Sequence, residues 1–302
     1  MTDYKIHIID TQYHGPLPIA TFLVESSKGL VLVETSAHST LENVKLKISE
    51  LGFDWKDIQH VLLTHIHLDH AGAAWCFAEN GATVYLHPFG YNHMNDPSKL
   101  LKSATMIYGD LMDYLWGTLK PIPADQLVIV EDGEVINILG LDFKSIHSPG
   151  HAKHHIAWQL NNHLFAGDLA GICFENGVVI PPCPPPDINI EDWTNSIDKV
   201  LAIQEIDTYY ITHIGKVTGD LIGHMKKLKK TLKEYAEFLL PYFQNQTDLN
   251  QTVQEFKRYT MDRLKAEGLS VKQIKDYEDS NSAIGSVQGI LRYWGKKLGA
   301  PQ

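Results

Sequence analysis

Three imidazoles and one carboxylate fall within six residues, in the run His65-Ile66-His67-Leu68-Asp69-His70. This run follows the apolar residues Val61-Leu62-Leu63, which predict a buried strand, so the polar cluster begins where a strand ends. Neutral imidazole and ionised carboxylate are the side-chain groups that bind zinc, iron, manganese and cobalt. The alternative is a histidine-rich polar turn without a metal. Four ligand groups at this density favour the metal site.

Three further residues of the same chemical types each follow an extended apolar run. They are His151, Asp168 and His213, after runs expected at residues 141–146, from about 163, and at 207–210. A lone histidine at a strand end is more often structural than a ligand. The repetition, with Gly150 and Gly167 permitting sharp turns, indicates one shared functional site.

The set His65-x-His67-x-Asp69-His70, followed by His151, Asp168 and His213, resembles the five-part signature of the metallo-β-lactamase superfamily. The resemblance covers about residues 4–218. It implies an α/β protein with a four-layer αββα sandwich and a site at one edge of its two packed sheets. It also implies two metal sites, with the ligands His65, His67 and His151 for the first ion, Asp69, His70 and His213 for the second, and Asp168 as a bridge. Many members have Asp-Thr-Gly after the third strand, where this chain has Glu34-Thr35-Ser36. That departure concerns loop geometry rather than metal binding.

Two divalent ions at such a site, with zinc expected and iron or manganese as alternatives, can share a water and lower its pKa toward neutrality. The prediction is therefore a dinuclear hydrolase whose metal-bridging hydroxide attacks a small ester, thioester, lactone or phosphoester. Asp69 is also the expected catalytic residue, since a carboxylate beside this water can orient it or take its proton. No Gly-x-Ser-x-Gly motif offers a serine nucleophile, and the three cysteines form no Cys-x-x-Cys pair.

Two other function classes stay open. A sulfur (persulfide) dioxygenase with a single iron would keep the fold and the motif, and a metal-stabilised binding protein would use the ligands without turnover. An open coordination position argues against the binding protein. Among hydrolases, the helical tail resembles that of glyoxalase II, whose basic residues hold the glutathione carboxylates. The residues that could serve this need are Lys257, Arg258, Arg263 and Lys265.

The composition predicts a cytoplasmic enzyme with a small-molecule substrate. The chain has 302 residues, 44% of them hydrophobic, and a formal net charge of −10, which argues against a nucleic-acid surface. Its first residues lack the features of a signal peptide, and no later run predicts a membrane span. Three cysteines in a chain of this length fit a reducing compartment.

Apolar periodicity predicts a catalytic domain over residues 1–218 and a helical subdomain over 219–302. Strands are expected at 5–9, 20–25, 30–34 and 60–63, and helices at 41–51, with Ser39 as N-cap, and 71–79. In the tail, Pro241 is expected to end a first helix, before helices at about 248–267, 271–279 and 283–298. This tail could cover the site or form a homodimer contact.

Two insertions are expected to shape the substrate pocket. Residues 97–121 predict one or two helices, from which Tyr108, Tyr114 and Trp116 are the candidates for lining a pocket over the metals. The proline segment, residues 180–187, has five prolines within six positions and is therefore stiff and extended. It is expected either to wall the site or to serve as a connector.

Overall fold

The computed structural model describes residues 3–13, 19–174, 177–213 and 215–299. Its contacts divide the chain into two units. Unit 1 comprises Met1–His147, His154–Gly167 and Glu205–Gly219, and unit 2 comprises Ser148–Lys153, Asp168–Gln204 and Asp220–Gln302. The expected domain boundary between residues 218 and 219 remains a prediction. No helix among the described residues is long and apolar enough to cross a membrane.

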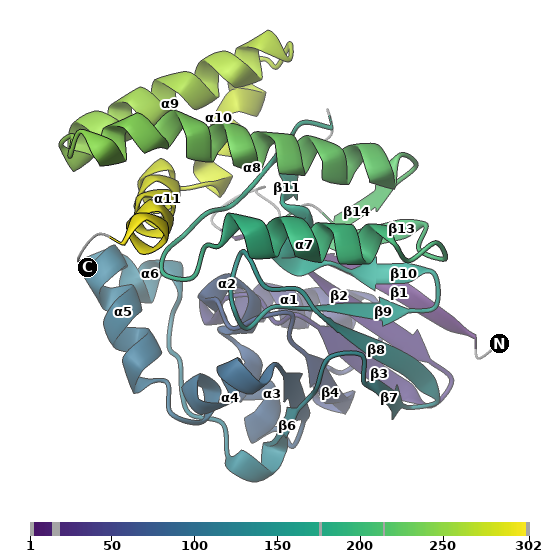
Figure 1. Cartoon of the computed structure of the whole chain (residues 1–302). Coiled ribbons are helices and arrows are strands. Elements are labelled where there is room, and N and C mark those ends of the chain that lie inside the picture. The colour runs from purple at the N-terminus through teal and green to yellow at the C-terminus, as the bar shows by residue number, and fades with distance from the viewer. Residues whose placement is uncertain (1–2, 14–18, 175–176, 214, 300–302) are drawn as a thin grey trace. The chain divides into compact units, whose positions relative to one another are not determined.

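The first sheet of unit 1 has the strand order β1-β2-β3-β4-β5-β6 (Figure 1). Its strands are β1 Tyr4–Asp10, β2 Ala20–Ser26, β3 Gly29–Val33, β4 Ile58–Leu62, β5 Thr83–Leu86 and β6 Leu127–Ile129. A tight turn joins β2 to β3, which are antiparallel, whereas β3 to β6 are parallel. Parallel neighbours need crossover connections, and the helices of unit 1 lie in those connections.

The second sheet of unit 1 has the order β14-β13-β10-β9-β8-β7. Its strands are β7 Val135–Ile138, β8 Leu141–His147, β9 Ile156–Leu160, β10 His163–Phe165, β13 Thr208–Ile211 and β14 Gly215–Thr218. One buried cluster joins side chains of both sheets, including Phe22 and Val31 from the first and Phe143, Trp158 and Phe165 from the second. The two sheets therefore pack face to face.

The helices of unit 1 pack on the other face of the first sheet, in a second cluster that joins Leu32 and Val61 to Val44 and Phe77. They are α1 Leu41–Glu50, α2 Leu68–Ala71, α3 Ala74–Glu79, α4 Pro88–Asn95, α5 Ser98–Tyr108 and α6 Met112–Leu115. Short 3-10 turns occupy His38–Thr40, Trp55–Asp57, Gly109–Leu111, Ala124–Gln126 and Gly167–Ala170.

Two expectations for these helices are wrong. Ser39 does not cap α1, because the N-cap position of this helix is Thr40. The Ser39 hydroxyl instead donates to the carbonyl of Leu115 at 2.7 Å. The single helix expected over 71–79 is broken, because the amide of Ala73 donates to the carbonyl of Ser36 rather than to a helical carbonyl. Tertiary hydrogen bonds decide both points.

Unit 2 is mainly helical, with α7 Ile190–Leu201, α8 Leu221–Gln244, α9 Leu249–Ala266, α10 Val271–Ser280 and α11 Ala283–Leu298, and the small hairpin β11 Ile172–Cys173 with β12 Val179–Ile180. The side chains of Asp220, Asp248, Ser270 and Ser282 accept amide hydrogen bonds at the starts of α8 to α11, as expected for N-caps. The expectation that Pro241 ends its helix is wrong, because α8 continues to Gln244. Proline removes only its own amide, and its carbonyl still accepts from Asn245 at 2.9 Å.

Candidate metal centre

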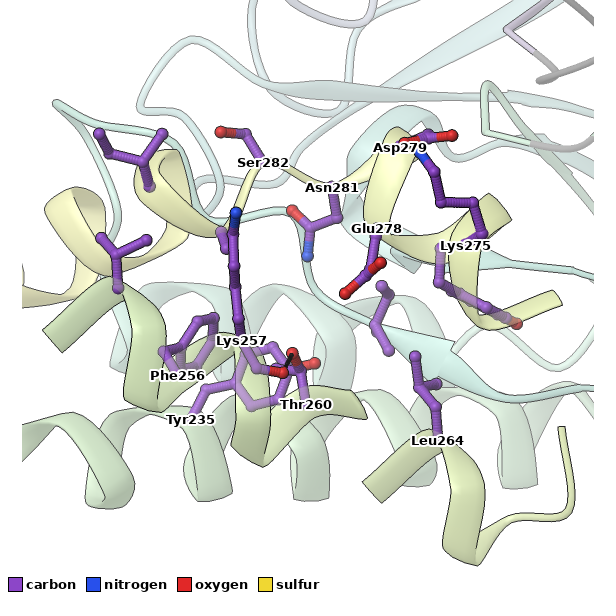
Figure 2. Close-up of a pocket in the computed structure, with 15 residues that line it drawn as sticks. Tyr235, Phe256, Lys257, Thr260, Leu264, Lys275, Glu278, Asp279, Asn281 and Ser282 are labelled. Atoms are coloured by element: carbon purple, nitrogen blue, oxygen red, sulfur yellow. Dashed lines mark hydrogen bonds and ion pairs between the residues drawn. The ribbon is translucent and has the colours of Figure 1, made fainter. Parts of the chain in front are cut away.

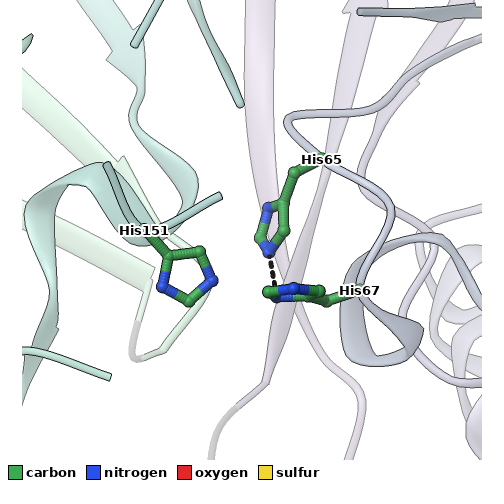
Figure 3. Close-up of side chains that lie close together, drawn as sticks. All are labelled: His65, His67 and His151. Carbon is green, nitrogen blue, oxygen red and sulfur yellow. Dashed lines mark hydrogen bonds between the residues drawn. The ribbon is translucent and has the colours of Figure 1, made fainter. Parts of the chain in front are cut away.

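The histidine loop of unit 1 begins at the end of β4 and passes into α2. His65 is buried, and its Nδ1 lies 3.0 Å from the Thr64 hydroxyl, which directs Nε2 the other way. This Nε2 lies 3.0 Å from Nδ1 of His67 (Figure 3). His67 occupies the N-cap position of α2, so Asp69 and His70 fall in its first turn. A short helix therefore gathers four ligand groups at one strand end.

Asp69, His70 and His213 form a compact group within unit 1. Oδ2 of Asp69 lies 3.5 Å from Nε2 of His70 and 3.4 Å from Nε2 of His213. One ligand atom from each of the three lies within 4.8 Å of the others. Metal–nitrogen bonds of about 2.0–2.1 Å place two ligand atoms of a tetrahedral site roughly 3.3–3.4 Å apart. The donor types and their spacing thus fit a divalent metal ion.

The ionisation of Asp69 also suits a ligand. Burial raises the pKa of the Asp69 carboxyl, but the imidazoles of His70 and His213 outweigh this effect and hold the pKa well below its usual range. Asp69 is therefore a carboxylate at neutral pH, and its oxygens are available as metal ligands.

Glu34 supports this loop from behind. Its buried carboxylate lies 3.5 Å from Nδ1 of His70 and accepts from the amide of Thr64 at 3.3 Å. Glu34 and Ser36 both have left-handed backbone, with φ of 66° and 61°. The amide of Thr35 donates to the carbonyl of His70 at 2.7 Å. The Glu34-Thr35-Ser36 segment, which departs from the family's Asp-Thr-Gly, thus still forms a loop that holds His70.

Two further histidines, His154 and His155, pack beside His65. Both are buried, and their ring centroids lie 6.1 Å and 5.1 Å from that of His65. They are brought there by hydrogen bonds between the sheets, since the amide of Ile156 donates to the carbonyl of Thr64 at 2.7 Å.

His151 and Asp168 lie together in unit 2. Nε2 of His151 is 3.2 Å from Oδ2 of Asp168, and its Nδ1 is 2.9 Å from the carbonyl oxygen of Pro182. The His151 ring also contacts the indole of Trp193 edge-on at 5.5 Å. A backbone carbonyl of the proline segment therefore orients the His151 ring, so that its Nε2 faces the Asp168 carboxylate. Figure 3 also draws His151.

Gly150 is required for this arrangement. It has φ of +139°, and a Cβ there would lie 2.2 Å from Cα of Trp193. Its carbonyl accepts from the amide of Asn189 at 2.8 Å, just before α7. The close approach of α7 to the 148–153 loop fixes the backbone beside His151.

The aromatic candidates of unit 1 form a cluster that includes one residue missed by sequence analysis, Tyr13. The Tyr13 ring stacks on Trp116 at 5.5 Å, and Tyr108 contacts Trp116 edge-on at 5.1 Å. Burial and the Asp69 charge raise the pKa of Tyr13, and the same two causes raise that of Tyr108 to about 12. Both hydroxyls are thus protonated and near Asp69. The Tyr114 side chain is 65% exposed.

Most basic candidates in the tail already have partners within unit 2. Arg263 pairs with Glu234 at 3.1 Å, Lys265 pairs with Asp262 at 3.3 Å, and Arg258 pairs with Glu255. Lys257 is the exception and lines a cavity.

Comparison with known proteins places these residues in a family. The superfamily model described as metallo-beta-lactamase matches residues 14–213. The chain is 34% identical over 181 residues to a metallo-beta-lactamase fold-containing protein of Sulfurisphaera tokodaii, covering 57% of this chain and 66% of that protein. It is 33% identical over 108 residues to a hydroxyacylglutathione hydrolase of Aeromonas hydrophila, covering 36% and 32%. It is 25% identical over 242 residues to a probable polyketide biosynthesis zinc-dependent hydrolase of Bacillus velezensis, covering 78% and 88%.

The first two of these matches span less than two thirds of the relatives' lengths. A crystal structure of a metallo-beta-lactamase family protein from Thermus thermophilus aligns with a TM-score of 0.71 at 21% identity, covering 98% of this chain and 94% of that one. The predicted α/β class, an αββα sandwich with a helical C-terminal extension, is thereby confirmed. Because the family model matches 200 of the 302 residues (14–213), the chain belongs to the metallo-β-lactamase superfamily.

Proposed function

We propose that this protein is a hydrolase that uses two divalent metal ions, with zinc as the expected metal, on a small-molecule ester, thioester, lactone or phosphoester. The observation that carries the proposal is the Asp69–His70–His213 group, whose spacing fits a metal ion. Two relatives are named as hydrolases, one of them zinc-dependent. The cytoplasmic location and the homodimer contact expected from the sequence remain predictions.

The proposed ligands follow the order of the family signature. His65, His67 and His151 would hold one ion, Asp69, His70 and His213 would hold the other, and Asp168 would contribute to both. Assigning His151 and Asp168 to the same two ions rests on the family's ligand order. Metal ions held there would supply an acidic water and a Lewis acid for the substrate's carbonyl or phosphoryl oxygen.

The chain's own groups complete the proposed chemistry. Asp69 lies beside two imidazoles and remains ionised, so it would accept a hydrogen bond from the attacking water and orient it. Tyr108 remains protonated at neutral pH and donates to a substrate oxygen. Together with Tyr13 and Trp116, it offers an aromatic wall for the substrate's apolar part.

A substrate panel tests this proposal. Metal-free protein is reconstituted with zinc, manganese or iron and assayed on acyl thioesters, lactones, aryl esters and phosphodiesters. We expect turnover of at least one class that is lost with a chelator and restored by metal. Asp69→Ala should lower kcat by about 10²-fold or more, whereas Asp57→Ala, which removes an exposed carboxylate of unit 1, should not change it.

Adding a persulfide to the panel, with oxygen consumption measured, separates the alternatives. Oxygen consumption with a persulfide by protein holding one iron would contradict hydrolysis and support the dioxygenase. Metal binding without turnover of any substrate class would instead support a binding protein.

A further inference from the structure

A cavity of about 600 Å³ lies within the helical part of unit 2 (Figure 2). Residues of α8, α9, α10 and the start of α11 line it, together with Ile180 of β12. Its apolar floor is formed mainly by Tyr235, Phe256, Leu264 and Tyr277, which are all buried. This volume is in the range of pockets that bind a small organic molecule.

The walls of the cavity are held by hydrogen bonds. Asn281, in the break between α10 and α11, donates from Nδ2 to the carbonyl of Pro181 at 3.3 Å and accepts from the Ser286 hydroxyl at 3.1 Å. Ser282 accepts from the amide of Gly285 and so fixes the start of α11. These contacts keep the rim in one position, so the cavity is formed before any ligand binds.

One buried polar group faces this cavity. The Tyr235 side chain is 1% exposed and lines the cavity, and its hydroxyl has no hydrogen-bond partner among the described residues. Burial raises the pKa of Tyr235, so the hydroxyl is a donor at neutral pH. The hydroxyl is therefore available to donate to a ligand carbonyl in the cavity.

The rim carries two opposite charges on different helices. Lys257 on α9 and Glu278 on α10 are exposed lining residues, and neither has an ion-pair partner in the part of the chain that the structure describes. By contrast, Lys275 and Asp279, also at the rim, pair with each other. The rim therefore offers one uncompensated cation and one uncompensated anion above an apolar floor (Figure 2).

We propose that this cavity binds a small zwitterion with a large apolar body, such as a dipeptide with apolar side chains. The ligand carboxylate lies against Lys257 and its ammonium against Glu278. The ligand side chains cover Phe256 and Leu264, and the peptide carbonyl accepts from the Tyr235 hydroxyl. A simple anion would use Lys257 alone, and a simple cation would use Glu278 alone. The site lies wholly within unit 2, and its occupancy is independent of the metal ions.

Calorimetric titration of the full-length protein with L-leucyl-L-phenylalanine tests the proposal. Two matched ligands each lack one charge, N-acetyl-L-leucyl-L-phenylalanine the ammonium and L-leucyl-L-phenylalaninamide the carboxylate. We expect saturable binding of the dipeptide with a Kd in the millimolar range or below, and weaker binding of both derivatives, each by about three- to fivefold.

Variants assign the two charges. Lys257→Gln should weaken the dipeptide about three- to fivefold and leave the amide unchanged, and Glu278→Gln should weaken it equally and leave the acetylated form unchanged. Tyr235→Phe should weaken all three ligands about fivefold. The control is Lys265→Gln, on the same helix but outside the cavity and paired with Asp262, and it should change nothing.

Several results would overturn the proposal. The first is a titration in which the dipeptide gives no saturable heat of binding. The second is equal affinity for the three ligands. The third is a loss of dipeptide affinity in Lys257→Gln that is no larger than the loss in the control variant. Tighter binding of the acetylated form than of the dipeptide would indicate a site for anions instead.

Discussion

Substitution of Gly167 by alanine should damage the proposed metal centre through Thr64. Gly167 follows β10 and has φ of +48°, and an added Cβ would lie 2.5 Å from the Thr64 hydroxyl and 2.8 Å from Nε2 of His155. Ordinary contact begins near 3.4 Å, so the hydroxyl must move by about an ångström. Thr64 and His155 are both buried, which leaves little room for that movement. The same hydroxyl holds Nδ1 of His65 at 3.0 Å.

The expected loss has two parts. Left-handed backbone costs alanine about 1 kcal/mol relative to glycine, and overpacking in a filled interior costs about 1–3 kcal/mol more. Gly167→Ala should therefore lower the free energy of unfolding by about 2–4 kcal/mol. Gly133→Ala is the matched control, because Gly133 has φ of +77° with nothing within 4 Å of the added Cβ, and it should lose only about 1 kcal/mol.

Urea denaturation of the metal-free proteins measures the stability, and competition with a chelator measures zinc affinity. Gly167→Ala should bind zinc at least about tenfold more weakly, since the outer contact of His65, a proposed ligand, is displaced. Adding Thr64→Ala removes the overlapping oxygen, whereas the Cβ of residue 64 and Nε2 of His155, each 2.8 Å from the added Cβ, remain. The double variant should therefore recover part of the stability and none of the zinc affinity. Equal stability and zinc affinity in Gly167→Ala and Gly133→Ala would refute the account of how His65 is oriented.

Three other predictions concern different parts of the chain. Burial and a neighbouring histidine lower the pKa of His87 to about 4. The unfolded chain binds this proton near pH 6.5, so stability that is present above pH 6.5 should be lost as the pH falls toward 4. His87→Asn should therefore flatten a measured curve of stability against pH over that range. Gly289→Ala places a Cβ 2.0 Å from a backbone oxygen of the proline segment, so the melting temperature of this variant should fall. Gly295 lies in the same helix, and a Cβ there meets only ordinary contacts. Gly295→Ala should therefore raise the melting temperature of the protein or leave it unchanged. Glu34→Ala removes the carboxylate behind His70, so zinc titration should show weaker binding by about tenfold to one of two sites, and unchanged affinity would contradict that role.

Much of the architecture could be predicted because its signals are local. Apolar runs predicted strands in both sheets, at 5–9, 20–25, 30–34 and 60–63 in the first sheet and at 141–146, from about 163, and at 207–210 in the second. The tail helices expected from about 248, 271 and 283 begin where Asp248, Ser270 and Ser282 accept amide hydrogen bonds, since a capping side chain acts within three residues of its own position. The histidine loop was also readable, because its four ligand groups share one short segment.

Other features depend on contacts between distant segments, which a single sequence does not reveal. Tyr13 joins the aromatic cluster by stacking on Trp116, about a hundred residues later. The break before α3 is decided by the hydrogen bond from Ala73 to Ser36. The proline segment could be read as a wall or as a connector, and its carbonyl contact with His151 appears only in the fold.

Metal content shows directly whether the site holds two ions. Elemental analysis of protein purified without added metal, alongside Asp168→Ala and His213→Ala, counts the ions per chain. The proposed site predicts close to two divalent ions, mainly zinc, in the native protein. It predicts that Asp168→Ala loses both and that His213→Ala mainly loses one. A single iron in the native protein, or full metal content in Asp168→Ala, would contradict a dinuclear centre bridged by this carboxylate.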